Sequence, residues 1–260
     1  MESKRLPRAP LVYVIAKIDF SPIENMESKI REIQDMLRNN GYPNYSAQEI
    51  SAFSVSPSLC VKKSKRWVFS NKEKSGCIRL TNDSIVFCVS DYDTFLVFVE
   101  HISDKLNAID SITDFHNGTI TEIQIRYIDL LTSLDGKSAN DFLCNEFFSS
   151  NLLFSEDTRM LQFMTEMNMD DNTMSRVILF SSKSKEFPPQ IVPVGLNQVS
   201  VTLDESMLIL DTTYTREVVD TDYDLNKICE NLNDLHLLSS KTFKEKLVTD
   251  EALKIWGKKS

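Results

Sequence analysis

The sequence predicts an α+β fold in which a mainly antiparallel sheet packs against long amphipathic helices. Residues 11–20 carry apolar side chains at every second position, which is the period of a strand covered on one side. Residues 22–39 repeat apolar side chains every three or four positions, as a helix with one buried stripe does. Shorter strand-like runs follow one another through tight turns, and this favours antiparallel pairing.

The first half is expected to open with a strand and a helix. Ser21 and Pro22 suit the N-cap and the first helical position, and Glu24 completes a capping box. Gly41 should end the helix, because glycine tolerates the left-handed conformation. Residues 42–65 are rich in serine and are expected to be irregular. The other elements expected here are strands 67–71, 76–81 and 84–90, a helix from Phe95 to Ile109 capped by Asp91 or Asp93, and strand 119–131.

The second half is expected to repeat the order of a strand meander followed by helices. Residues 170–172 read as a hairpin turn, and Pro188 and Pro189 mark a loop. The elements expected are helix 139–148, strands 160–169, 174–182, 199–203 and 207–216, a helix through Leu225 and Leu235, a second helix from Ser239 or Ser240, and a last turn from Thr249 to Trp256. We expect two joined α+β halves, residues 1–135 and 136–260, with a pseudo-duplication as one possible origin. The alternative to two domains is that the halves form one continuous domain.

The composition is that of a globular protein with an acidic surface. Hydrophobic residues make up 42% of the chain and charged residues 26%, which is enough apolar material for a substantial core. The net charge of −9 repels nucleic acids and anionic membranes at long range. No apolar run approaches the roughly 20 residues that span a bilayer, and the first residues lack the apolar segment of a signal peptide. We therefore expect no membrane association.

The cysteine pattern indicates a reducing compartment. The five cysteines are odd in number and include no CxxC pair, so a structural zinc site is not expected. Several of them have apolar neighbours, as small buried thiols do. The location predicted from this pattern is cytoplasmic.

Recognisable catalytic patterns are absent from the sequence. No GxSxG, HExxH, GxxxxGK[ST] or GxGxxG pattern occurs. The three histidines, His101, His116 and His236, lie outside any such motif, and each fits a boundary or surface position. We therefore expect no catalytic residue, no cofactor and no metal, and the sequence leans away from an enzyme.

One segment runs against the acidic balance of the chain. Between residues 62 and 74 it carries six basic residues and one acidic residue. Basic side chains beside a tryptophan suit contact with a phosphate backbone and stacking on a base. The alternative is a solvated edge strand protected by lysines. The candidate nucleic-acid-binding residues are Lys62, Lys63, Lys65, Arg66 and Trp67.

A candidate anion site lies in the strand 119–131. The alternation of this strand sends Tyr127 inward and Arg126 to the opposite face, where an arginine can bind a carboxylate or phosphate through two hydrogen bonds. Arg216, at the end of a later strand, is a candidate for a matching role. The alternative is that Arg126 pairs with an acid on a neighbouring strand, since the chain has 38 acidic residues.

Three short segments resemble a known family. They are the opening Ala9-Pro-Leu-Val-Tyr-Val14 with Phe20-Ser-Pro-Ile23, the central Arg126-Tyr-Ile-Asp129, and Phe243 followed by Val248-Thr-Asp250. These segments resemble a sporadically distributed prokaryotic family of uncharacterised proteins of similar length, which tends toward Asn where this chain has Asp129. The resemblance spans the whole chain and implies no catalytic residues. Such a patchy distribution is typical of mobile or defence-associated genes.

Three functions are compatible with these observations. The leading hypothesis is a non-enzymatic binding or interaction protein with a protein partner or self-association, such as an antitoxin or a defence-system accessory subunit. The second is a protein that binds or processes nucleic acid through residues 62–74. The third is an enzyme whose site is assembled around Arg126, with Tyr127 and Glu166. A deep pocket would favour the enzyme, a flat apolar patch the protein partner, and a positive groove the nucleic acid.

Overall fold

Runs of consecutive strands separate the longer helices along the chain. The structure is a computed structural model and describes residues 6–55, 59–144, 160–182, 187–199 and 207–258. The first elements are β1 (Leu11–Phe20), α1 (Met26–Asn39), β2 (Asn44–Val55), β3 (Leu59–Ser70), β4 (Gly76–Leu80), β5 (Ser84–Val89), α2 (Phe95–Thr113) and the 3-10 turn η1 (Phe115–Asn117). The later elements are β6 (Thr119–Leu131), the 3-10 turn η2 (Ala139–Phe142), β7 (Met160–Asn168), β8 (Thr173–Ser182), β9 (Met207–Asp222), α3 (Leu225–Thr242), the π-helical turn η4 (Phe243–Leu247) and α4 (Asp250–Trp256).

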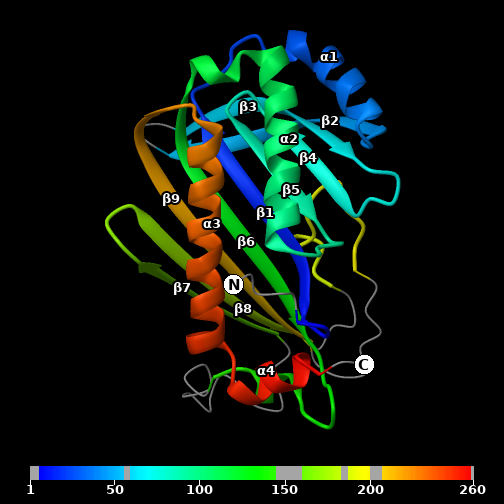
Figure 1. Cartoon of the computed structure of the whole chain (residues 1–260), viewed down its shortest axis with the longest axis vertical. Coiled ribbons are helices and arrows are strands. Elements are labelled where there is room, and N and C mark those ends of the chain that lie inside the picture. Colours follow the sequence, from blue (N-terminus) through cyan, green and yellow to red (C-terminus); the bar gives the residue numbers. More distant parts are fainter. Residues whose placement is uncertain (1–5, 56–58, 145–159, 183–186, 200–206, 259–260) are drawn as a thin grey trace.

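The described strands form one antiparallel sheet. Their order is β2-β3-β4-β5-β1-β6-β9-β8-β7, so β1 and β6 lie at the centre (Figure 1). This confirms the α+β class with a mainly antiparallel sheet. β6 joins the two halves of the chain, because it pairs with β1 on one side and with β9 on the other. The division of the chain at residue 135 stays a prediction.

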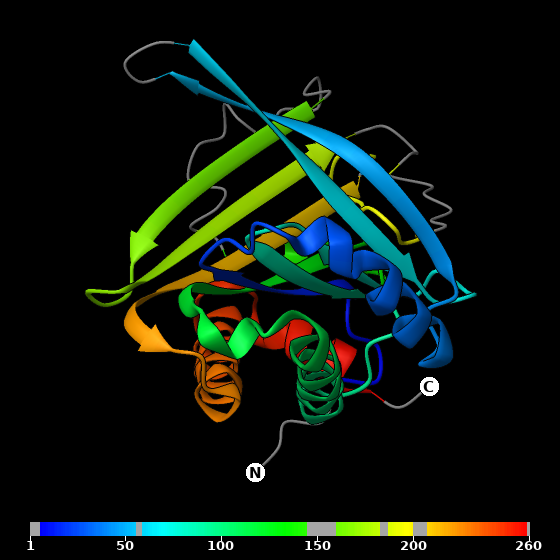
Figure 2. The ribbon, with the colours of Figure 1, turned by 90° about the horizontal axis from the view of Figure 1, so that it is seen from above.

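The helices α2 and α3 lie across one face of the sheet, with α1 packed beside α2 (Figures 1 and 2). A hydrophobic core fills the space between the helices and this face. The side chains of β1 that face the helices are buried at every second position, from Val14 to Phe20. The expectation of a strand covered on one side holds only for residues 17–20, because Tyr13 and Ile15 on the opposite face are buried in a second core. Buried residues that the core takes from β1, β6, α1, α2 and α3 include Val14, Ile18, Ile125, Ile33, Ile102 and Leu232.

The opposite face of the sheet is concave, because β2 and β3 at one end and β7 and β8 at the other curl away from the helices (Figure 2). The segment 187–199 covers part of this face, where Phe187 and Leu196 pack with Ile128 in a second core. Gly195 permits the close approach: its φ is +98°, and a Cβ there would lie 2.7 Å from Val68 Cγ1. One part of the concave face is thus sealed, and another keeps polar side chains.

A third core closes the end of the molecule that holds α4. Trp256 packs against Phe142 of η2 with ring centroids 5.3 Å apart. Thr249 caps α4 by accepting a hydrogen bond from the N–H of Ala252 at 3.2 Å. The backbone N–H of Arg8 donates to the carbonyl of Trp256 at 3.0 Å, so this end of the fold also anchors the segment 6–11.

The largest difference from the sequence prediction is at residues 42–65. These residues were expected to be irregular, but they form the long hairpin of β2 and β3, which pair from Asn44 opposite Ser70 to Val55 opposite Leu59. The prediction was wrong because serine favours turns only weakly. An unbroken cross-strand register outweighs that preference.

Helix ends also differ from those expected. α1 begins at Met26 rather than at Pro22, and the side chain of Ser21 accepts a hydrogen bond from the N–H of Thr119 at 3.1 Å instead of capping the helix. α2 is capped by Thr94 rather than by an aspartate. The expected second helix from residue 239 is the uninterrupted end of α3.

The remaining predictions have mixed outcomes. The hairpin turn at residues 170–172 is confirmed, since it joins the paired strands β7 and β8. The helix expected at 139–148 is the short turn η2, and the residues after 144 lie outside the described part, as does most of the strand expected at 199–203. Among the described helices, none is both long and apolar enough to cross a bilayer.

Candidate functional site

A basic cavity lies on the concave face of the sheet. Its volume is about 270 Å³, and β3, β4, β5, β1 and β6 contribute to its lining. Lys17, Arg66, Arg79 and Arg126 supply positive charge from four different strands, next to the polar side chain of Gln124. The sheet thereby brings together Arg66 and Arg126, two candidates that are far apart in the sequence.

Arg66 and Arg79 are two arginines of this cavity that form no ion pair with a carboxylate among the described residues. The Nε atoms of both are enclosed, and within the described residues neither has a hydrogen-bond acceptor. Burial lowers the pKa of Arg66, and the positive charge of Arg79 lowers it further. Two adjacent guanidinium groups without a carboxylate between them favour an anion as their partner.

Arg126 is held by an acid of the neighbouring strand. Its Nε donates to Asp211 Oδ1 at 2.8 Å and its Nη2 donates to Asp211 Oδ2 at 2.6 Å. Asp211 lies on β9 and is buried. Burial lowers the pKa of Arg126, but the hydrogen bonds and the charge of Asp211 raise it by more. The pairing expected as the alternative is therefore the observed arrangement, and Arg126 faces the cavity with its charge largely compensated.

The basic segment of the sequence is divided between the two faces of the sheet. Arg66 lines the cavity, whereas Trp67 is only 5% exposed and packs in the helix-covered core. This corrects the expectation that Trp67 stacks on a base, because its ring is enclosed. Lys65 shares the face of Trp67 and pairs with a glutamate of α1. The backbone of Lys62 and Lys63 belongs to β3, and their side chains lie outside the described part.

Arg216 does not join Arg126. It lies on the helix-covered face, where its Nη1 donates to Asn231 Oδ1 at 3.0 Å and to Asp234 Oδ2 at 3.3 Å. Both partners belong to α3, so Arg216 ties β9 to that helix. The expected matching role for Arg216 finds no support in this position.

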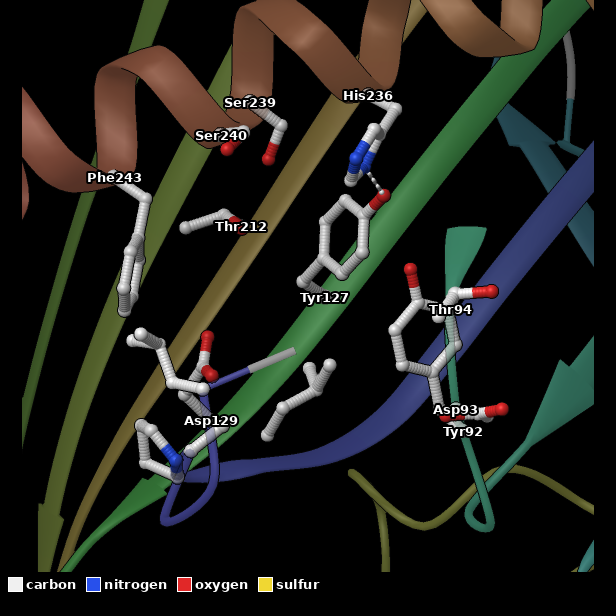
Figure 3. Close-up of a pocket in the computed structure, with 14 residues that line it drawn as sticks. Tyr92, Asp93, Thr94, Tyr127, Asp129, Thr212, His236, Ser239, Ser240 and Phe243 are labelled. Atoms are coloured by element: carbon white, nitrogen blue, oxygen red, sulfur yellow. Dashed lines mark hydrogen bonds between the residues drawn. The ribbon is translucent and has the colours of Figure 1, made fainter. Parts of the chain in front are cut away.

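A second cavity, the α3 pocket, lies on the helix-covered face (Figure 3). It has a volume of about 130 Å³ and is enclosed by the segment 6–11, the loop before α2, β6, β9 and the end of α3. Its walls are mostly apolar, with Pro10, Leu11 and Phe243 among them. The groups that give it chemical character are the side chains of Tyr127, Asp129 and His236.

Tyr127 and His236 form an uncharged pair on one wall of the α3 pocket. The hydroxyl oxygen of Tyr127 lies 2.6 Å from Nδ1 of His236 (Figure 3). The imidazole stacks on Phe95 with a centroid distance of 4.0 Å. Burial lowers the pKa of His236 to about 4, with a smaller contribution from the positive charge of Lys244. Burial also raises the pKa of Tyr127, so both groups are neutral near pH 7.

Asp129 is a buried acid whose carboxyl group points into the α3 pocket (Figure 3). Its side chain is only 5% exposed. No hydrogen bond or ion pair reaches its carboxyl group from the residues that the structure describes. Burial raises the pKa of Asp129 to about 7, and the negative charge of Asp211 adds to the effect. Near neutral pH this carboxyl group is therefore poised between its neutral and charged forms.

Sequence reasoning missed Arg79 and Lys17 as site residues, and it did not bring Tyr127, Asp129 and His236 together in one pocket. A usable signal existed for two of the residues, because each is a charged side chain in a short apolar strand. Arg79 stands in the strand Gly76–Leu80, and Asp129 is preceded by Ile128 and followed by two leucines. A charge inside such a run is either paired or functional.

The edge strand β7 presents apolar side chains to solvent. Met160 is 67% exposed, Met164 56% and Phe163 43%. Met164 lies on the concave side and Phe163 on the helix side, since neighbours on a strand alternate. Exposed apolar residues on an edge strand favour association with another chain.

Comparisons with known proteins identify no relative on which to base a function. No family model matches the chain, and no curated protein matches it. Among solved structures, a chain of the Schizosaccharomyces pombe Mediator head module is similar with 10% identity, over 91% of this chain and 98% of that chain, at a TM-score of 0.17. A likeness at this level carries no argument about fold or function. The family resemblance drawn from the sequence stays a prediction, and the two sites are interpreted from their own geometry.

Proposed function

We propose that the protein binds a small, multiply charged anion of the phosphate class in the basic cavity of the concave face. One observation carries the proposal: within the described residues, Arg66 and Arg79 line the same cavity without a carboxylate beside them, in a chain whose net charge is −9. Holding two like charges together in a partly dehydrated site costs free energy. An anion between them removes the repulsion and accepts their N–H groups.

The cavity residues take different roles in this proposal. Arg66 and Arg79 donate charge-assisted hydrogen bonds to the anion through their guanidinium groups. Lys17 adds positive charge, although its Nζ also contacts Asp19. Arg126 is already engaged by Asp211, so it contributes mainly to the electric field in the cavity.

A compact anion suits the cavity better than a nucleic acid strand. Proteins that bind single strands stack the bases on aromatic side chains, but Trp67 is buried and no aromatic residue belongs to the lining of the cavity. The negative net charge also repels a long polyanion. Free pyrophosphate and a phosphate group at the end of a larger molecule share the same chemistry.

Isothermal titration calorimetry with pyrophosphate and with a single-stranded oligonucleotide tests the proposal. Wild-type protein should bind pyrophosphate, and Arg66→Gln or Arg79→Gln should weaken binding by roughly ten- to a hundredfold, because a hydrogen bond to a charged group contributes about 1.5–3 kcal/mol. Arg38→Gln is a matched control, since Arg38 is exposed at the end of α1. Its affinity should equal that of wild type.

Two results would contradict this proposal. Pyrophosphate binding that survives both cavity substitutions would place the anion elsewhere. Tighter binding of the oligonucleotide than of pyrophosphate, lost in both variants, would replace the compact anion with a nucleic acid strand. Measuring at two salt concentrations separates these cases, since a strand that contacts many phosphate groups shows the steeper salt dependence.

A second candidate function is self-association through β7. The exposure of Met160 and Met164 on β7, the edge strand of the described sheet, supports it, because two copies of one edge strand can pair about a two-fold axis. Light scattering after size exclusion should then report a dimer, and Met164→Lys should return it to a monomer. A wild-type monomer at high concentration would refute this candidate.

We also propose that the two halves descend from a duplicated unit that ends in a long amphipathic helix. In each half the opening strand, β1 or β6, pairs with the last strand of its own meander, β5 or β9, and a helix follows. Buried side chains recur every three or four residues in both helices: Phe98, Ile102 and Leu106 in α2, and Ile228, Leu232 and Leu235 in α3. An internal superposition that failed to place α2 on α3 would refute the duplication.

The compartment that we propose is the cytoplasm. Cys77 and Cys88 are opposite each other on β4 and β5 and are free thiols. Such neighbours are expected to stay reduced in a reducing compartment. Recovery of the native protein only from an oxidising compartment, with this pair as a disulfide, would contradict the assignment.

A further inference from the structure

The α3 pocket contains a buried acidic side chain, whereas the basic cavity on the other face of the sheet is lined by arginines and a lysine. We propose that this pocket binds a small organic cation, a protonated amine with an apolar body. The ammonium group lies against the carboxylate of Asp129, and the apolar body lies against Pro10, Leu11 and Phe243. This inference is independent of the anion site.

The first step of the argument is the charge around Asp129. The charged and titratable groups nearest to it on the elements packed around it include Asp211 of β9, Tyr127 of β6, His236 of α3, Lys244 of η4, Tyr92 and Asp93 before α2, and Arg8 of the segment 6–11. Asp211 is negative and engaged by Arg126. The guanidinium of Arg8 donates to Asp135 at 2.9 and 3.1 Å, away from the pocket. Burial and the charge of Asp211 raise the pKa of Asp129, and within the described residues no cation offsets them.

The second step is the character of the remaining wall. Tyr127 and His236 are neutral and are bonded to each other, so they offer polarity without charge. Tyr92 and Phe243 add aromatic rings to the lining. The faces of aromatic rings attract cations, which strengthens the preference for a positive ligand. A carboxylate within an aromatic and apolar enclosure is a suitable receptor for an ammonium group.

The third step is size. The pocket volume of about 130 Å³ is close to that of cavities that hold a benzene-sized molecule. The apolar body of the ligand is therefore expected to be one small ring or a short branched chain. Larger ligands such as peptides or nucleotides are too big for the described pocket.

The proton on Asp129 makes the binding depend on pH. The carboxyl group must be ionised to pair with the ammonium group, and burial raises its pKa to about 7. Binding below pH 7 therefore releases this proton to solvent. From this pKa the affinity at pH 6 is expected to be about tenfold weaker than at pH 8, where an alkyl amine is still protonated.

Calorimetric titration with benzylamine, and with neutral benzyl alcohol as its isostere, tests the inference on the full chain. Benzylamine should bind at pH 8 at least tenfold more tightly than benzyl alcohol. Its affinity should fall about tenfold at pH 6, and titrations in two buffers of different ionisation enthalpy should report the released proton. Asp129→Asn should remove the preference for the amine and its pH dependence. Asp104→Asn, at an exposed position of α2, should leave both unchanged.

Three outcomes would overturn the inference. They are equal affinity for benzylamine and benzyl alcohol, undiminished benzylamine binding by Asp129→Asn, and no binding of either probe at millimolar concentration. The wild-type pH dependence keeps the inference testable even if the asparagine variant does not fold.

Discussion

The two faces of the sheet leave opposite charges unpaired. On the concave face, Arg66 and Arg79 have no carboxylate beside them within the described residues. On the helix-covered face, Asp129 has no cation beside it within the same part of the chain. The comparison shows that one sheet can hold a basic and an acidic site back to back, provided that each is closed to the other by the backbone layer.

Strand alternation explains why these charges do not neutralise each other. Arg126 and Asp129 both belong to β6, but they stand at positions of opposite parity and therefore on opposite faces. The side chain of Asp211 on β9 points to the same face as Arg126, and the two form an ion pair there. The central ion pair is thus satisfied, whereas Asp129 stays alone in the core. A shift of register by one residue would exchange the faces.

The strongest test of the comparison is to remove the carboxylate that engages Arg126 on the concave face. Asp211→Asn removes the buried partner of Arg126, whose own side chain is 30% exposed. Breaking a fully buried ion pair costs about 3–5 kcal/mol, and the partial exposure of Arg126 places the expected loss at the lower end of that range. Urea unfolding measures the loss. Pyrophosphate should bind the variant more tightly, because a third guanidinium becomes free for the anion.

Asp234→Asn is the matched control for that variant. Asp234 also pairs with an arginine, but its side chain is 60% exposed, and exposed pairs contribute about 0–1 kcal/mol. Equal losses of stability for the two variants would show that burial of the central pair is not what distinguishes it.

A second test separates the stability of the two faces. Ile125 is fully buried under the helices, and Ile125→Ala should lower the free energy of unfolding by about 2–5 kcal/mol through lost burial and the cavity left behind. Met164 of β7 is 56% exposed, and Met164→Ala should change it by less than about 0.5 kcal/mol. A large effect at Met164 would indicate that β7 is covered in solution, as the dimer requires.

A third test uses the pH dependence of stability. The folded state favours the protonated form of Asp129, because burial raises its pKa to about 7. The protein is therefore most stable with respect to this group below about pH 4, the pKa of the same carboxyl group in the unfolded chain. That contribution is lost as the pH rises to 7, by an amount on the order of 4 kcal/mol. Asp129→Asn should therefore abolish a loss of stability between pH 4 and 7 that wild type displays. Thermal unfolding across this range measures it.

The pKa of Asp135 is shifted in the direction opposite to that of Asp129, so its effect on stability has the opposite pH dependence. Hydrogen bonds from Arg8 and Lys258 lower the pKa of Asp135 to about 2, so its contribution is present above pH 4 and disappears as the pH falls toward 2. Asp135→Asn should flatten the acidic limb of the stability profile and leave the range above pH 4 unchanged. The same profile for both asparagine variants would contradict the assignment of the two carboxyl groups.

The smallest expected effect concerns the tyrosine–histidine pairs. Tyr127 bonds to His236, and Tyr42 lies 2.7 Å from His101 in a similar contact near α2. Tyr127→Phe and Tyr42→Phe should each cost about 1 kcal/mol in urea unfolding, the usual contribution of one hydrogen bond. A much larger loss for Tyr127 alone would show that its hydroxyl also supports the pocket.

Part of the fold could be predicted because its signals are local. The alternation of residues 11–20 identified β1, and the turn at 170–172 identified the hairpin of β7 and β8. The hairpin of β2 and β3 could not be identified in this way, because its serine-rich strands derive their stability from the pairing partner rather than from their own composition.

The sites were harder to predict, since they depend on contacts between distant strands. Sequence alternation correctly placed Arg126 opposite Tyr127 but could not identify Asp211 as its partner. It also could not reveal that Trp67 faces away from Arg66 into a core built by other elements. Asp129 was visible only as a departure from a family tendency, and its burial depends on α3 and the segment 6–11.

The most direct test of the account is a crossed titration of pyrophosphate and benzylamine against wild type, the double variant Arg66→Gln/Arg79→Gln, and Asp129→Asn. The two-face account predicts that the arginine variant loses only pyrophosphate and that the aspartate variant loses only the preference for the amine. Loss of both ligands in either variant, or of neither ligand in both, would contradict it.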